Sequence, residues 1–380
     1  MKIPAVLVTS LLLAAPLRSE TQPTRVDLEA RLAPADPGTA PLYGVLTPLF
    51  LDHLERTVSK DRLAELWKAT DRNAFLALLE KVTGRDLLET GERMFEALEK
   101  DAVRAPAPPG DWVNSEAGPF TLHMRPDSAA QRDLALIEKD ATETWTRVAA
   151  LLDLSEAVDA SHRLLAGDGR IDVYLHAARA GEGKDRLGHG HGGTSLGGTI
   201  VDGKGRLTTR IDVLYLNAFS LAVLEHEVAH AVVLLAAFDA AAFAKHALED
   251  KAGLKTAFLA AYRKVPAFLH EGLGDYALYH HGLQKSWGLL PEPRKILTSL
   301  RASGKTLPLE ELLAGDVRFR AKNHKVFSLE AAAFLDFLLA TRGKELVRRW
   351  LFSGEPNGAK SFAKVFGTGI DALEKEFWSR

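Results

Sequence analysis

The chain of 380 residues has no cysteine, and this absence excludes several kinds of site. Disulfide bonds, thiolate metal ligands, cysteine nucleophiles and cysteine-linked lipids all require that side chain. The sequence does contain 13 histidines and 50 acidic residues. A metal ion in this protein must therefore be held by imidazole and carboxylate groups.

The sequence also has almost no net charge, because 48 Lys and Arg stand against 50 Asp and Glu to give −2. Proteins that bind nucleic acids usually carry a basic excess, so we expect no nucleic-acid partner. Apolar residues make up 46% of the chain and charged residues 26%, which is typical of a globular protein. The length suits two or three structural units.

Long apolar runs are scarce, and the first one lies at the N-terminus. Met1 and Lys2 precede a mostly apolar stretch from Ile3 to Leu17, which is too short to span a membrane as a helix. The pattern predicts a secretory signal peptide over residues 1–19 and a secreted or periplasmic protein without a membrane span in its mature form. An uncleaved N-terminal anchor is the alternative, and the cleavage site stays open.

The positions of proline and glycine residues predict the organisation of the rest of the chain. Residues 20–46 are expected to be a flexible lead-in, 47–104 a small all-α region, 105–110 a proline-rich linker, and 111–380 one further domain. Within the all-α region, Asp71 is placed to cap a helix that Gly84 ends.

The domain over 111–380 combines strand and helix patterns. Strands are expected at 120–124, 171–175, 199–201 and 211–215, a long amphipathic helix at 128–152, and mostly helix from Ala218 onward. The expected fold class is therefore α+β, with a mixed sheet followed by a helical C-terminal half.

The main chemical signal is His226-Glu227-Val228-Ala229-His230, a His-Glu-x-x-His pattern inside an apolar stretch. Residues four apart share one face of a helix, so His226 and His230 can bind one ion. Glu227 lies about 100° away around the helix, where it can take a proton from water beside that ion. Polar side chains in a buried helix are costly unless they are paired or bind a metal.

A catalytic zinc site needs a third protein ligand. Downstream, Pro266 begins a helical pattern in which Glu271 and Asp275 lie one turn apart, and His270 stands beside Glu271. Either His270 or Glu271 is a candidate for the third ligand at this point.

The two segments together resemble the gluzincin zinc metallopeptidases of the peptidase MA-like family, in which a Pro-x-x-x-x-Glu-Gly-x-x-x-Tyr helix follows the His-Glu-x-x-His helix. The likeness covers about residues 111–380 and implies a zincin-like metallopeptidase domain that hydrolyses peptide bonds of a peptide or protein substrate. It implies that His226, His230 and Glu271 bind Zn²⁺, and that Glu227 is the general base for attack by the zinc-bound water. It also implies that Asp275 orients one ligand histidine.

The sequence departs from this family in one respect. The residue that stabilises the oxyanion cannot be assigned, since Phe327 stands where the family often has tyrosine. The candidates for this role or for substrate contact are Tyr276, Tyr279 and His324, and packing in the core is the favoured interpretation of Tyr276.

Two further interpretations stay open at the level of the sequence. A catalytically impaired zinc-binding protein with the same fold, acting as an envelope-associated binding module, is the alternative to a peptidase. Residues 20–105 are a candidate intramolecular pro-segment. The glycine-rich stretch 188–193 is interpreted as a mobile loop. If it has a function, it is a flap over the cleft or a weak second metal site.

Overall fold

A computed structural model describes most of the chain and divides it into two compact units, Met1–Met94 and Phe95–Arg380. The described residues are 50–85, 111–178, 191–246, 248–281, 293–315 and 317–379, with isolated residues at 28, 32, 89–90, 93–94, 96–97 and 187. The expected signal peptide and the linker at 105–110 lie outside the described residues, as does nearly all of the expected lead-in.

All regular secondary structure described in the first unit is helical. A helical stretch over 50–57 is followed by α4 (Lys60–Leu66) and α5 (Arg72–Thr83). The predicted ends of α5 are confirmed: Asp71 Oδ1 accepts a hydrogen bond from Ala74 N at 2.9 Å, and Gly84 has the left-handed φ of 69°. Leu66 and Leu79 are fully buried, so these helices form a small core of their own.

The second unit contains one mixed sheet of five strands in the order β1-β2-β3-β5-β4. β2 and β3 are parallel, as are β3 and β5, whereas β1 and β4 pair antiparallel with their neighbours at the two edges. The strands are β1 (Val113–Ala117), β2 (Phe120–Met124), β3 (Ile171–His176), β4 (Gly192–Val201) and β5 (Lys204–Leu214).

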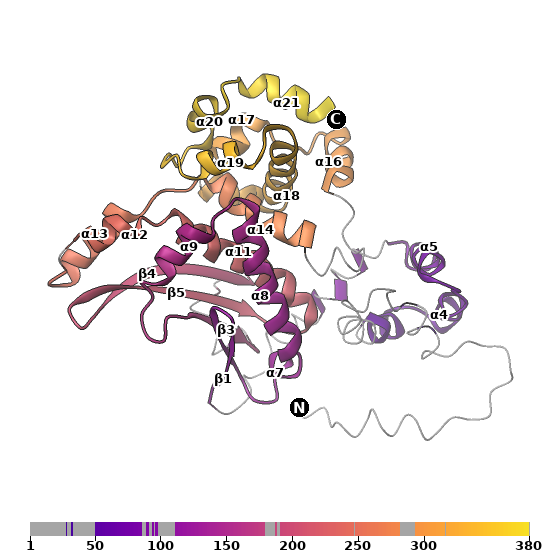
Figure 1. Cartoon of the computed structure of the whole chain (residues 1–380). Coiled ribbons are helices and arrows are strands. Elements are labelled where there is room, and N and C mark those ends of the chain that lie inside the picture. The colour runs from indigo at the N-terminus through magenta and orange to yellow at the C-terminus, as the bar shows by residue number, and fades with distance from the viewer. Residues whose placement is uncertain are drawn as a thin grey trace. The chain divides into compact units, whose positions relative to one another are not determined.

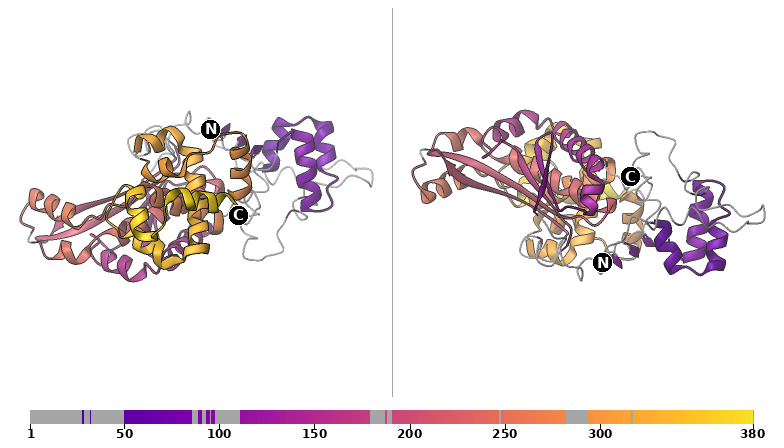
Figure 2. Two further views of the ribbon diagram at one scale, coloured as in Figure 1. Left: turned by 90° about the horizontal axis from the view of Figure 1, so that it is seen from above. Right: turned by 90° about the horizontal axis from the view of Figure 1, so that it is seen from below.

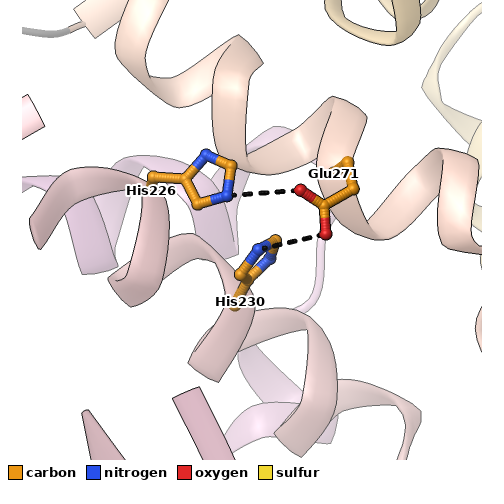
Figure 3. A group of neighbouring side chains, drawn as sticks. All are labelled: His226, His230 and Glu271. Carbon is orange, nitrogen blue, oxygen red and sulfur yellow. Dashed lines mark ion pairs between the residues drawn. The ribbon is translucent and has the colours of Figure 1, made fainter. Parts of the chain in front are cut away.

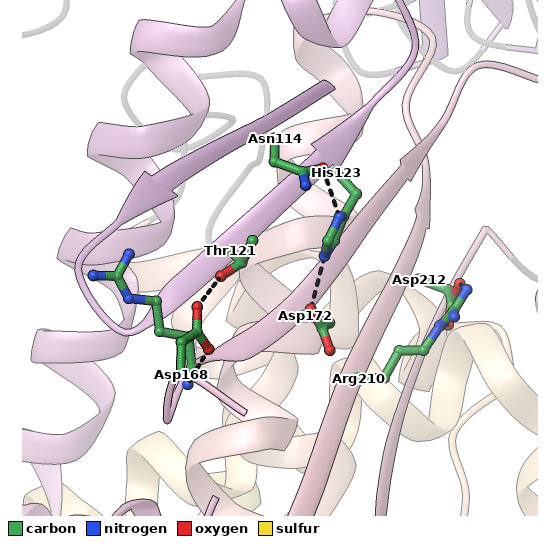
Figure 4. A network of polar contacts seen from close by, with 8 residues as sticks. Asn114, Thr121, His123, Asp168, Asp172, Arg210 and Asp212 are labelled. Carbon is green, nitrogen blue, oxygen red and sulfur yellow. Dashed lines mark hydrogen bonds and ion pairs between the residues drawn. The ribbon is translucent and has the colours of Figure 1, made fainter. Parts of the chain in front are cut away.

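Alternation along the strands separates an apolar face from a polar face. On the apolar face, β4 and β5 pack against helix α11 (Leu221–Ala237), and residues such as Leu122 and Val173 are fully buried. The other face carries a polar network, which Figure 4 shows. There His123 bridges Asn114 and Asp172 at 2.8 and 2.7 Å, and Arg210 contacts Asp212.

Helices make up the remainder of the second unit, and α11 lies between the sheet and the C-terminal helices (Figures 1 and 2). A core of aromatic and aliphatic side chains, with Phe334 and Trp350 fully buried, holds the C-terminal helices together. The helices are α7 (Ala129–Arg132), α8 (Leu134–Leu151), α9 (Ser155–His162), α11 (Leu221–Ala237), α12 (Ala240–Ala244), α13 (Lys251–Ala261), α14 (Ala267–His281), α16 (Pro293–Ala302), α17 (Leu309–Ala314), α18 (Val317–Arg342), α19 (Lys344–Leu351), α20 (Gly358–Phe366) and α21 (Ile370–Ser379).

The α+β class, with a sheet followed by a helical C-terminal half, is confirmed, whereas the expected helix over 128–152 and the expected strand at 199–201 need correction. The expected single helix over 128–152 is two helices, because the backbone leaves the helical conformation at Asp133, whose buried carboxylate binds Arg132 and Tyr215. The strand expected at 199–201 begins at Gly192, so Gly192 and Gly193 belong to β4 rather than to a loop. Strand β1 was not predicted, since its sequence is polar and exposed.

Candidate metal centre

Helix α11 carries the His-Glu-x-x-His pattern through the interior of the second unit. Its apolar residues are buried all round, as expected for a helix between a sheet and other helices. Glu227 and His230 are buried with them, and the His226 side chain is 17% exposed. These polar groups therefore need partners inside the protein.

Helix α14 supplies the partner. Glu271 Oε2 lies 3.5 Å from His226 Nε2, and Glu271 Oε1 lies 3.7 Å from His230 Nε2 (Figure 3). One donor atom from each of the three residues lies within 4.8 Å of the others. The close approach depends on Gly274, because a Cβ at that position would lie 2.7 Å from the His226 ring.

These distances fit one bound cation. Zinc bonds of about 2.0–2.2 Å in a tetrahedral site place neighbouring donor atoms roughly 3.3 Å apart, close to the distances seen here. If Asp275 accepts the proton on His226 Nδ1, the lone pair of Nε2 points toward the Glu271 carboxylate. Two facing acceptors are unfavourable unless a proton or a metal ion lies between them. His226, His230 and Glu271 could therefore hold a metal ion.

The charges around the three residues favour the charged forms of His226 and Glu271. Burial by itself lowers the pKa of His226, but the carboxylates of Asp275 and Glu271 outweigh burial and raise it well above its usual value. Burial tends to raise the pKa of Glu271, whereas hydrogen bonds from His226 and His270 and the charge of His230 hold it far below its usual range. The site thus keeps Glu271 ionised and attracts positive charge.

Asp275 contacts the His226 ring on the side opposite Glu271. Its Oδ1 is 2.8 Å from His226 Nδ1, the ring nitrogen that faces away from Glu271. A carboxylate in that position fixes the tautomer and the orientation of a ligand imidazole.

Glu227 points to β4 rather than to α14. The Thr194 hydroxyl lies 2.8 Å from Glu227 Oε2 and 2.9 Å from the Glu227 backbone oxygen, so its single proton can serve either acceptor. Gly192 lies against the other carboxylate oxygen, since a Cβ there would be 2.8 Å from Oε1. Burial raises the pKa of Glu227, and the charge of His226 and the Thr194 hydrogen bond oppose that rise.

The remaining candidates lie around the three central residues. The His270 ring stacks on His230 with centroids 3.7 Å apart, and His270 is not one of the three residues whose donor atoms cluster. Tyr276 stacks on His280 and, like Tyr279, packs against the core of the C-terminal helices. Phe327 is fully buried in the same core. The side chain of His324 and residues 188–190 lie outside the described part of the chain.

Sequence reasoning missed Thr194, Gly192 and Gly274. Thr194 and Gly192 lie more than 30 residues before Glu227 in a segment interpreted as a loop or a short strand, so no local pattern linked them to it. Gly274 had a weak signal, because a glycine inside the Glu271–Tyr276 helical pattern is unfavourable unless another element approaches closely.

Among the described residues, Ala218–Ala237 alone is long and apolar enough to cross a membrane, and 83% of its most apolar window is buried inside the protein. Such burial is typical of a helix in a protein core.

No family model, no curated protein and no solved structure matches this chain.

Proposed function

We propose that the chain is a zinc-dependent peptidase of the gluzincin type, with a zincin-like fold over the second unit. The observation that carries the proposal is the convergence of Glu271 on His226 and His230, with Glu227 on the same helix. Two imidazoles and one carboxylate that leave a coordination position open are the ligand set of many catalytic zinc sites.

Zinc is the proposed metal because of the donor types. Imidazole nitrogen with a single carboxylate suits zinc, whereas magnesium and calcium prefer oxygen donors throughout. When bound, the ion would supply Lewis acidity, polarising the substrate carbonyl and lowering the pKa of water at the site.

The protein's own residues would then handle the protons. Glu227 is buried with a raised pKa, which suits a group that takes a proton from water and later returns it to the leaving amine. Thr194 would hold the Glu227 carboxyl in place, and Asp275 would orient His226. Tyr276, Tyr279 and His324 remain candidates for contact with the oxyanion or the substrate.

Replacement of Glu227 by Gln tests this proposal. We expect the variant to bind one zinc ion per chain, as measured by elemental analysis. Its rate of hydrolysis of a mixture of peptides should be at least about 100-fold lower than that of the unmodified protein. The exposed Glu249→Gln variant is the matched control and should keep both properties. Chelation should stop hydrolysis by the unmodified protein, and added zinc should restore it.

Two outcomes would contradict the proposal. Undiminished hydrolysis by the Glu227→Gln variant would remove the proposed base. Zinc binding without hydrolysis by the unmodified protein would instead favour the alternative, a zinc-binding interaction module.

Export and self-inhibition are separate proposals from the N-terminal sequence. We propose that residues 1–19 direct the chain to the periplasm or the medium, and that residues 20–105 act as a pro-segment. N-terminal sequencing of the exported protein tests the first proposal.

The proposed pro-segment over residues 20–105 predicts autolysis near 105–110 and higher peptidase activity after its truncation.

A further inference from the structure

Strand β4 forms an edge of the sheet, and one side of it has no strand partner among the described residues. The Leu214 N–H donates to His191 O at 2.7 Å, so odd-numbered residues of β4 bond to β5. The N–H and C=O groups of the even-numbered residues, from Gly192 to Ile200, therefore point away from the sheet. Such an edge can accept an extended polypeptide as an additional strand.

A groove of about 680 Å³ lies between the outer half of β4 and α13, which are neighbours in Figures 1 and 2. We call it the β4–α13 groove. Leu254 and Phe258 contribute large apolar side chains to it. Gly198 has no side chain to fill the groove, and it lies close to Leu254, because a Cβ there would be 3.3 Å from Leu254 Cδ1. The described lining residues are Gly197, Gly198, Thr199, Ile200, Asp250, Lys251, Leu254, Lys255 and Phe258.

The charge of the groove is positive. Lys251 and Lys255 are exposed one helical turn apart, and neither forms an ion pair with a residue in the described ranges. Asp250, the one acidic residue among the described lining, accepts a hydrogen bond from Gly253 N at 2.7 Å as the cap of α13. An occupant with acidic side chains is therefore favoured over a basic one.

The same strand also reaches the candidate metal centre, where Thr194 contacts Glu227. Gly198 lies four residues beyond Thr194, or about 14 Å along a strand. A polypeptide bound at the metal centre can thus enter the groove with residues roughly four to six positions from the bond to be cleaved.

We infer that the β4–α13 groove binds an extended segment of the polypeptide substrate, remote from the cleaved bond. Apolar side chains of that segment pack on Leu254 and Phe258, and acidic side chains lie beside Lys251 and Lys255. The inference rests on the proposed function, because it takes the occupant to be part of the substrate.

Fluorescence anisotropy with the full-length, zinc-loaded Glu227→Gln protein tests the inference without cleavage of the probe. The probe is a fluorescein-labelled peptide of about 12 residues in which Glu and Val alternate, long enough to cover the outer half of β4. Lys/Val and Glu/Ser peptides of equal length test charge and apolar contact. We expect the Glu/Val peptide to bind at least about tenfold more tightly than either, and less tightly as salt rises.

Reversing the charge of the two groove lysines tests whether the peptide binds in the β4–α13 groove. Adding Lys251→Glu and Lys255→Glu should weaken binding of the Glu/Val peptide at least about tenfold, whereas the exposed Lys245→Glu change outside the groove should alter it less than about twofold. Equal binding by the Lys251→Glu/Lys255→Glu protein, no preference for the Glu/Val peptide, or no binding would overturn the inference.

These results are separable from the fate of the proposed function. Groove-dependent binding by a protein that never hydrolyses peptides would refute the peptidase and leave the groove as a peptide-binding site rather than a substrate site. Hydrolysis of long acidic peptides that is indifferent to Lys251→Glu and Lys255→Glu would refute the groove and leave the peptidase standing.

Discussion

Among individual residues, Glu227 is held in place by a strand rather than by its own helix. Thr194 donates toward Oε2, and Gly192 leaves room for Oε1. Both oxygens of the proposed base are thereby positioned by β4, and His226 one residue earlier faces α14. Successive residues of a helix point about 100° apart. His226 can therefore face the candidate metal centre while Glu227 is placed to accept a proton.

Thr194→Val removes the hydroxyl with little change in shape. The Thr194 hydrogen bond lowers the pKa of Glu227, so its loss raises that pKa and leaves the base protonated up to a higher pH. We expect kcat to fall about tenfold with KM nearly unchanged, and the acidic limb of the pH–rate profile to move to higher pH.

Thr194→Ser keeps the hydroxyl and is expected to restore most of the rate and the original profile. Zinc content should be the same in all three proteins. A Thr194→Val protein with an unaltered pH profile would show that this hydroxyl does not act on Glu227.

Among the elements, β4 presents neighbouring residues to opposite faces of the sheet. Gly192 and Thr194 share the face toward α11, whereas Gly193 points to the other face. A Cβ at Gly192 would lie 2.6 Å from Val223 and 2.8 Å from Glu227 Oε1, and a Cβ at Gly193 meets nothing within 4 Å. The two neighbouring glycines thus form a matched pair for substitution.

Gly192→Ala should push β4 away from α11 and displace Glu227, whereas Gly193→Ala should be accommodated. We expect the first change to lower peptide hydrolysis at least about tenfold and the second to alter it less than about twofold, with zinc bound in both. Equal rates for the two variants would mean that β4 does not position the proposed base.

In the second unit, a buried carboxyl group away from the candidate metal centre contributes to the pH dependence of stability. Glu330 on α18 is 2% exposed and accepts hydrogen bonds from Leu307 N at 3.0 and 3.2 Å. Burial, with the charge of Glu374, raises its pKa to about 8 and outweighs the opposing Leu307 hydrogen bond. The folded protein therefore binds a proton on Glu330 more tightly than the unfolded chain does.

The contribution of protonated Glu330 to stability is complete below the unfolded pKa near 4.5 and is lost as pH rises to about 8. Glu330→Gln keeps an acceptor for Leu307 N and removes the charge. We expect the variant to match the unmodified protein near pH 5 and to exceed its free energy of unfolding by about 1–3 kcal/mol near pH 8.

Denaturant unfolding followed by tryptophan fluorescence at the two pH values measures this difference. A difference that does not change with pH would contradict the raised pKa of Glu330.

Local patterns in the sequence predicted the helix ends at Asp71 and Gly84, the strands β2 and β3, and the shared face of His226 and His230. Each depends on residues a few positions apart, so the chain itself encodes it. The break at Asp133 could not be predicted, because it depends on Tyr215, which is 82 residues away.

The sequence alone determined that no metal ligand is a thiolate, and that two imidazoles lie one helical turn apart. Only the tertiary structure decided that Glu271, and not its neighbour His270, completes the group. Adjacent residues on α14 point about 100° apart, and which of them faces α11 depends on how the two helices pack at Gly274. The contact between Thr194 and Glu227 was decided in the same way, because it exists only once the sheet lies on α11.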